Sequence, residues 1–179
     1  MLTLVTGGSG SGKSEFAEIL SVLYKSKNLI YIATMFPYDD ESLKKVERHK
    51  RMREHKNFKT IECFKNLKDV VIPEDSTVLL DCMSNLVANE MYIGDGTNEN
   101  VVENILQGIH HIRDKSENFV IVTNEVFSDG IDYDDETMKY IKYLGKINLE
   151  IGKEADNVVE IVYSIPIYHK GGMDNVEFI

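Results

Sequence analysis

The sequence contains no tryptophan, only three prolines and only two cysteines in 179 residues. The scarcity of proline and an ordinary apolar content of 42% exclude a disordered or collagen-like chain. Cys63 and Cys82 belong to no CxxC motif and have no histidine at metal-ligand spacing, so they predict a reduced thiol pair. No apolar run approaches the roughly 20 residues of a membrane span, and the N-terminus lacks a signal-peptide pattern. We therefore expect a cytoplasmic protein without stable membrane association.

The chain also has few basic residues, 20 against 30 acidic ones, which gives a net charge of −10. This balance argues against nucleic acid as the main partner. The basic residues are unevenly placed, however, and eight of the twenty lie between Lys44 and Lys59, whereas a cluster of acids follows at 129–136. The basic segment predicts a place where an anionic ligand is held.

Short apolar runs alternate along the chain with segments of helical periodicity. Most of these runs are continuously apolar, which is typical of parallel strands buried on both faces. We therefore expect one α/β domain, residues 1–179, with a mostly parallel sheet and helices on both faces. Strands are expected at 2–6, 28–34, 58–63, 77–82, 118–123 and 157–163, and helices at about 13–25, 40–56, 86–93, 101–112 and 134–155.

A glycine-rich loop follows the first expected strand and matches the pattern GxxxxGK[ST]. Backbone N–H groups of such a loop surround a phosphate chain, and the following helix N-terminus adds a favourable dipole. Lys13 is expected to reach the β- and γ-phosphates, and the Ser14 hydroxyl to bind Mg²⁺. The alternative is a chance glycine-rich turn, which the strand–loop–helix context disfavours. The motif consists of Gly7, Gly8, Ser9, Gly10, Ser11, Gly12, Lys13 and Ser14.

Asp81 ends the apolar run at 77–82. An acid at the carboxyl end of a parallel strand lies where open α/β sheets bind ligands. We expect Asp81 to be the second partner of Mg²⁺, although a helix N-cap or a surface acid is the alternative. Together with the loop, it predicts binding of a nucleoside triphosphate.

His49 lies inside the basic segment, on the thin apolar side of its expected helix. A histidine there is commonly structural, but its cationic neighbours could neutralise a polyphosphate. A neutral imidazole beside a triphosphate can attack phosphorus and form a phosphoramidate. His55 is the rival nucleophile, whereas His110, His111 and His169 are expected to be structural or solvated.

Taken in order, these residues resemble the bifunctional adenosylcobinamide kinase / adenosylcobinamide-phosphate guanylyltransferase family. The resemblance spans nearly the whole chain, and the histidine segment, NLVANEM and TNEV are more specific than the phosphate loop. It rests on LVTGGSGSGKSEFAE (4–18), YIAT (31–34), DDE with the RH pair (39–53), FKTIE (58–62), LLDCMSNLVANEM (79–91), VIVTNEV (120–126) and LGKINLEIGKEADNVVEIV (144–162).

The resemblance implies a RecA-like P-loop NTPase fold, a homotrimer and two reactions. Adenosylcobinamide is phosphorylated with ATP or GTP, and GMP is then transferred from GTP through a guanylyl-histidine intermediate to give adenosylcobinamide-GDP. His49 matches the guanylylated histidine of the family, and Lys13 serves phosphoryl transfer. The further positions that match nucleotide contacts are Thr34, Lys50, Arg51, Met52, Arg53, Glu62 and Asp81.

The chain departs from the family pattern at Gly10 and Phe58, where arginine and tryptophan are usual. Further departures are Phe127, Met138 and Tyr143, in place of glycine, arginine and an acid. Two other functions compete with the bifunctional enzyme. One is a single-function P-loop kinase of another small metabolite, which has no need of His49. The other is a non-enzymatic, nucleotide-dependent switch.

Overall fold

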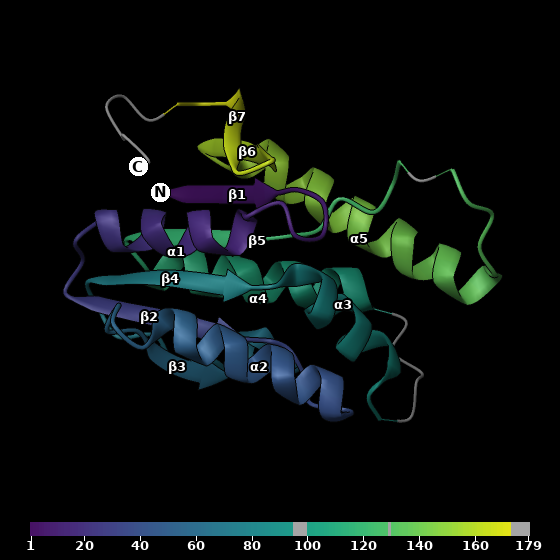
Figure 1. The fold of residues 1–179 in the computed structure, drawn as a ribbon, viewed down its shortest axis with the longest axis horizontal. Helices are drawn as coiled ribbons and strands as arrows, with labels where there is room; N and C mark the ends of the chain where they lie inside the picture. Colours follow the sequence, from purple (N-terminus) through teal and green to yellow (C-terminus); the bar gives the residue numbers. More distant parts are fainter. Residues whose placement is uncertain (95–99, 129, 173–179) are drawn as a thin grey trace.

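The computed structural model describes residues 1–94, 100–128 and 130–172, without the side chains of Glu41, Lys45 and Met52 (Figure 1). Its elements mostly alternate between strand and helix, as the sequence predicts, except that α4 follows α3 and β7 follows β6. In chain order they are β1 Leu2–Thr6, α1 Lys13–Leu23, β2 Asn28–Ala33, α2 Asp40–Arg53, β3 Lys59–Glu62, the 3-10 helix η1 Leu67–Asp69, β4 Ser76–Asp81, α3 Met83–Tyr92, α4 Val101–Lys115, β5 Asn118–Val122, α5 Asp135–Glu154, β6 Asn157–Val162 and β7 Ile165–Lys170.

The strands form one seven-stranded sheet in the order β3-β2-β4-β5-β1-β6-β7. All neighbouring pairs are parallel except β6 and β7. The mostly parallel α/β architecture is therefore confirmed, but taking 157–163 as the final strand is wrong. The missed hairpin turns at Tyr163 and Ser164, both with positive φ, without the glycine or asparagine that usually marks such a turn.

Helices cover both faces of the sheet (Figure 1). On one face, Phe16, Ala17 and Leu20 of α1 pack against apolar side chains of the sheet. On the other face, α3, α4 and α5 bury a larger apolar cluster that includes Leu86, Ile109 and Ile147. Two covered faces explain why the inner strands are continuously apolar.

Two helices begin at aspartates whose side chains satisfy backbone N–H groups. Asp39 and Ser42 form a capping box at α2, with a 2.7 Å bond from the Ser42 N–H to Asp39 Oδ1. Asp134 accepts hydrogen bonds from the N–H groups of Glu136 and Thr137 at α5, and these bonds lower the pKa of Asp134. The caps fix where α2, which carries His49, and α5 start.

α3 begins at Met83, directly after β4, rather than at residue 86 as expected. The segment between the helices expected at 86–93 and 101–112 lies largely outside the described residues, as does Asp129, the first residue of the acidic cluster. None of the described helices has both the length and the apolar character that crossing a membrane requires.

The carboxyl ends of the parallel strands bring distant residues to one edge of the sheet. In register, Ala33 of β2 stands between Glu62 of β3 and Asp81 of β4. The phosphate loop leaves β1 at the same edge, on the far side of β5 from β4. Because the strands are about 4.8 Å apart, Glu62 and Asp81 are separated by roughly 10 Å.

Candidate active site

The phosphate loop packs tightly between β1, β6 and the start of α1. A Cβ atom on Gly7 would lie 2.6 Å from the carbonyl oxygen of Ile161, and one on Gly12 would lie 2.8 Å from Oγ of Ser164. Gly12 also has a φ of +94°, which disfavours any side chain. No described side chain caps α1, so its first N–H groups are available to an anion.

Lys13 lies at the start of α1 and is largely buried, with 8% of its surface exposed. Its Nζ atom donates a hydrogen bond of 3.0 Å to the carbonyl oxygen of Gly8. Burial lowers the pKa of Lys13, while nearby Cys82 and Asp81 oppose the shift. The lysine is thus held over its own loop, with the Asp81 carboxylate as its nearby counter-charge.

Asp81 stands at the end of β4 and is also buried, with 8% of its surface exposed. The hydroxyl of Tyr31 donates a 2.9 Å hydrogen bond to Oδ2 of Asp81. Burial, followed by the Asp81 charge, raises the pKa of Tyr31, so the tyrosine is a permanent donor. Tyr31 lies inside an apolar strand, and no local pattern signals this role.

His49 extends from α2 to the same carboxylate. Its Nδ1 atom lies 3.6 Å from Asp81 Oδ2, and its side chain is 27% exposed. Nδ1 is buried and has no hydrogen-bond partner within the described residues. The distance suits an electrostatic contact that becomes a hydrogen bond after a small movement. Of the two candidate nucleophiles, His49 is therefore the one beside Asp81, whereas His55 is exposed.

Arg53 anchors the C-terminal end of α2 to the sheet. Its guanidinium carbon lies 3.4 Å from the centroid of the Tyr31 ring, a cation–π contact. Phe58 meets the same ring edge-on, with the centroids 6.2 Å apart. Arg53 is only 6% exposed, and one guanidinium nitrogen, Nη1, has no partner in the described part of the chain. An anion entering here would find that N–H group unsatisfied.

A partly buried ion pair joins the segment after α2 to α1, the helix that follows the phosphate loop. Lys56 Nζ lies 2.6 Å from Oε2 of Glu18 in α1, whose side chain is fully buried. Oε1 of Glu18 has no partner among the described residues. Because an unpaired buried charge is costly, this pair holds the two segments together.

Thr34, which the sequence predicts as a nucleotide contact, is engaged with the backbone of Cys82. Its hydroxyl donates to the Cys82 carbonyl and accepts from the Cys82 N–H, both at 2.8 Å. Asn89 of α3 donates to the Thr34 carbonyl at 2.7 Å. These bonds fix the turn that carries Asp81. Asn89 lies in the NLVANEM segment of the family resemblance, but that segment does not indicate its contact with Thr34.

The remaining basic residues of α2 lie at the rim of the site. Lys50 and Arg51 are exposed, and the side chain of Met52 lies outside the described part of the structure. A small pocket of about 130 Å³ is lined by Lys50, Arg53, Glu54, Asn57, Phe58 and Thr60. The structure thus gathers two predicted cations, Lys50 and Arg53, around one concavity.

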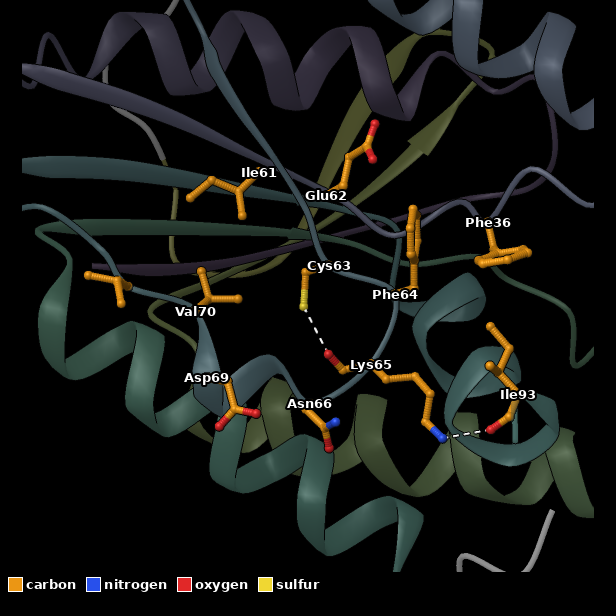
Figure 2. Close-up of a pocket in the computed structure, with 11 residues that line it drawn as sticks. Phe36, Ile61, Glu62, Cys63, Phe64, Lys65, Asn66, Asp69, Val70 and Ile93 are labelled. Carbon is orange, nitrogen blue, oxygen red and sulfur yellow. Dashed lines mark hydrogen bonds between the residues drawn. The ribbon is translucent and has the colours of Figure 1, made fainter. Parts of the chain in front are cut away.

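Glu62 lies apart from the His49–Asp81 pair. It lines a pocket of about 630 Å³ at the end of β3, together with Phe36, Phe64 and Asn66 (Figure 2). In Figure 2 its carboxylate points away from Asn66 and Asp69. Because side chains alternate along a strand, Glu62 faces the same side of the sheet as Ala33 and Asp81. Its side chain is therefore directed to the side that holds His49, about 10 Å from Asp81.

A magnesium ion fits the arrangement only together with phosphate. No described group of three or more His, Cys, Asp or Glu side chains is placed to hold a metal. Mg²⁺ at a nucleotide needs fewer protein ligands, because phosphate oxygens and water complete its shell. Ser14 in the first turn of α1 and the buried carboxylate of Asp81 provide suitable oxygens.

The other three histidines contact groups outside the candidate site, as expected for structural or solvated residues. His110 approaches Glu154 at 3.1 Å, His111 contacts the Val70 carbonyl at 3.1 Å, and the ring of His169 lies 2.8 Å from Glu160.

Both cysteines are free and buried, which confirms the reduced pair. Burial raises the pKa of each thiol to about 11. A thiol with such a pKa stays protonated near neutrality and is a poor nucleophile.

Comparison with known proteins gives a consistent match over the chain. The family model described as cobinamide kinase / cobinamide phosphate guanyltransferase matches residues 3–168. The "bifunctional adenosylcobalamin biosynthesis protein CobU" of Salmonella typhimurium is 29% identical over 182 residues, covering 93% of this chain and 98% of the relative. The protein of the same name from Escherichia coli is 29% identical over 183 residues, with the same coverage.

A solved structure shares the fold at much lower sequence similarity. It is an ATPase domain with a TM-score of 0.50 and 10% identity, and the match covers 89% of this chain and 68% of that one. This likeness places the chain among RecA-like P-loop NTPase folds.

Proposed function

The chain belongs to the cobinamide kinase / cobinamide phosphate guanyltransferase family, and from this premise we propose that it carries out both reactions. In the first, adenosylcobinamide is phosphorylated on its hydroxyl by ATP or GTP. In the second, GMP passes from GTP to the phosphorylated product through a guanylyl-histidine intermediate, giving adenosylcobinamide-GDP. The observation that carries the proposal is the approach of His49 to Asp81 at 3.6 Å, beside the buried lysine of a phosphate loop.

Phosphoryl transfer is assigned to the phosphate loop. The acceptor hydroxyl oxygen forms a bond to the γ-phosphorus while the bond from that phosphorus to the β-bridging oxygen breaks. The nucleoside diphosphate leaves, and the hydroxyl proton passes to solvent. Lys13 neutralises charge on the transferring group, and this reaction depends mainly on such positioning and neutralisation. Ser14 and Asp81 would hold Mg²⁺, which would supply further neutralisation of the phosphates.

Guanylyl transfer is assigned to His49. Nε2 forms a bond to the α-phosphorus of GTP, and pyrophosphate leaves as the bond to the α,β-bridging oxygen breaks. A phosphate oxygen of cobinamide phosphate then attacks the same phosphorus, and the P–N bond breaks to restore the imidazole. Asp81 near Nδ1 favours the tautomer that leaves Nε2 unprotonated, while Lys50, Arg51 and Arg53 supply positive charge for the triphosphate.

Covalent labelling tests this proposal. The protein is incubated with Mg²⁺ and GTP labelled at the α-phosphate, denatured, and assayed for acid-labile, base-stable label. We expect label on the wild type and on His55→Ala but none on His49→Ala, which should still phosphorylate cobinamide. His55→Ala is the matched control, because it removes the other histidine of the same segment.

A wild type that binds GTP but takes no label contradicts the guanylyl-histidine route. Cobinamide phosphorylation then distinguishes a kinase that acts on cobinamide from the two rival functions, since a kinase of another metabolite and a nucleotide-dependent switch both leave cobinamide unmodified. The homotrimer implied by the family resemblance is tested separately, by light scattering coupled to gel filtration.

A further inference from the structure

Tyr163 is an aromatic residue exposed in a strained position. Its side chain is 90% exposed, although aromatic rings are normally among the most buried groups of a domain. Tyr163 and Ser164 form the turn between β6 and β7, with φ values of +50° and +64°. A two-residue hairpin loop of type I′ requires positive φ at both positions, but a bulky tyrosine is uncommon in such a loop.

The turn is bound directly to the phosphate loop. The N–H of Ser164 donates a 2.9 Å hydrogen bond to the carbonyl oxygen of Ser11. Gly12 approaches Ser164 so closely that a Cβ on the glycine would lie 2.8 Å from the serine Oγ. The β6–β7 turn, whose first residue is Tyr163, therefore lies beside the loop at the point where α1 begins.

The order of the strands indicates which way a nucleoside triphosphate bound in this loop points. β4, which ends at Asp81, lies on one side of β1, beyond β5, and β6 lies on the other side. Asp81 and His49 thus mark the reacting end of the site. When the γ-phosphate points to that end, as phosphoryl transfer requires, the nucleoside at the opposite end of the triphosphate points toward the β6–β7 turn.

We propose that Tyr163 is the base-binding platform for the nucleotide that donates its γ-phosphate, and that its ring stacks on the purine. This inference rests on the proposed function. Stacking on an aromatic face tolerates different bases, so the same platform accepts ATP and GTP.

Guanylyl transfer places a different demand on the nucleotide. His49 attacks the α-phosphorus, so the α-phosphate must lie at the Asp81 end and the guanosine beyond it, away from β6. In guanylyl transfer the triphosphate of GTP therefore lies in the loop in the opposite direction to that of the kinase nucleotide, with the guanosine away from the β6–β7 turn. Tyr163 accordingly serves the kinase reaction and not the formation of guanylyl-His49.

Nucleotide binding to the full chain tests the platform. Calorimetry compares a non-hydrolysable ATP analogue with inorganic tripolyphosphate, which has the phosphates but no base, in the wild type, Tyr163→Ala, Tyr163→Asn and Tyr163→Phe. Asparagine tolerates positive φ, so Tyr163→Asn removes the ring while keeping the turn. Ile165→Ala is the matched control, because Ile165 is 63% exposed on the same hairpin.

We expect Tyr163→Ala and Tyr163→Asn to raise the Kd for the ATP analogue about tenfold, as the loss of one base–aromatic stack does. The Kd for tripolyphosphate should stay within about twofold, Tyr163→Phe and Ile165→Ala should bind like the wild type, and labelling of His49 by α-labelled GTP should be unchanged.

An unchanged affinity for the ATP analogue in both ring-removing variants overturns the proposal. Equal weakening of tripolyphosphate overturns it as well, since the turn would then support the loop and not the base. A fall in His49 labelling that matches the loss of ATP affinity overturns the reversed orientation. These binding measurements need no corrinoid, so a failure of the proposed cobinamide activity is recognised separately.

Discussion

The Nδ1 atom of His49 lies 3.6 Å from Oδ2 of Asp81, and the same oxygen accepts the hydrogen bond of Tyr31. One buried carboxylate therefore faces a helix that carries the proposed nucleophile and a strand that carries a permanent hydrogen-bond donor. The Tyr31 ring, in turn, supports Arg53 at the end of that helix. Tyr31 thus contacts two residues of the site: its hydroxyl bonds to Asp81, and the face of its ring packs against Arg53.

Replacing Tyr31 with phenylalanine separates these two contributions. The ring that supports Arg53 remains, but Asp81 loses a hydrogen bond worth about 1 kcal/mol. We expect the single-turnover rate of His49 guanylylation to fall about fivefold, with little change in GTP affinity. Tyr92→Phe is the control, since Tyr92 is an exposed tyrosine outside the site. An unaltered rate in Tyr31→Phe would show that the hydroxyl does not position Asp81.

Lys13→Ala should damage phosphoryl transfer far more than folding. The substitution removes a charge aimed at the transferring group, and such groups are worth roughly 10²–10³ in rate. Steady-state kinase assays with cobinamide measure the loss, and circular dichroism checks the fold. Lys27→Ala, an exposed lysine outside the loop, should retain wild-type turnover. Wild-type turnover in Lys13→Ala itself would contradict the phosphate-loop assignment.

Gly12→Ala should distort the phosphate loop. The new methyl group meets Ser164 Oγ at 2.8 Å and occupies a backbone position with φ of +94°. We expect about 1–3 kcal/mol lower stability in urea unfolding and at least a tenfold loss of ATP affinity.

Gly152→Ala provides the contrast for Gly12→Ala. A Cβ on Gly152 has open space around it in α5, so alanine should stabilise the protein by about 0.5–1 kcal/mol. Equal effects of the two substitutions would mean that the contact with Ser164 is not close.

Lys56→Met should leave the carboxylate of Glu18 buried without its counter-charge. The lysine side chain is 26% exposed and the glutamate side chain fully buried. Breaking a fully buried pair costs about 3–5 kcal/mol, and partial exposure of the lysine reduces this to about 2 kcal/mol. Urea unfolding measures the change. Lys59→Met, at an exposed lysine of β3, should stay within about 0.5 kcal/mol of the wild type.

The glycine loop, Asp81 and His49 were recognisable in the sequence because each has a local signature. The loop is a contiguous motif, Asp81 ends an apolar run, and His49 lies in a concentrated basic segment. Tyr31 and Asn89 lie in segments that carry the family resemblance, YIAT and NLVANEM, but neither segment indicates their contacts, since one residue lies in an apolar strand and the other in a helix. Their partners are 50 and 55 residues away in the chain. The sequence predicts Thr34 as a nucleotide contact, yet its hydroxyl bonds to the Cys82 backbone.

Local patterns in the chain were sufficient to establish the alternation of strands and helices, the parallel sheet and the phosphate loop. Periodicity, glycine placement and helix caps act over a few residues, so they are readable without the fold. Long-range packing alone established that β1 lies between β5 and β6, that His49 meets Asp81, and that the β6–β7 turn reaches the loop. These contacts join segments far apart in the chain, and their formation depends on how both faces of the sheet are covered by helices.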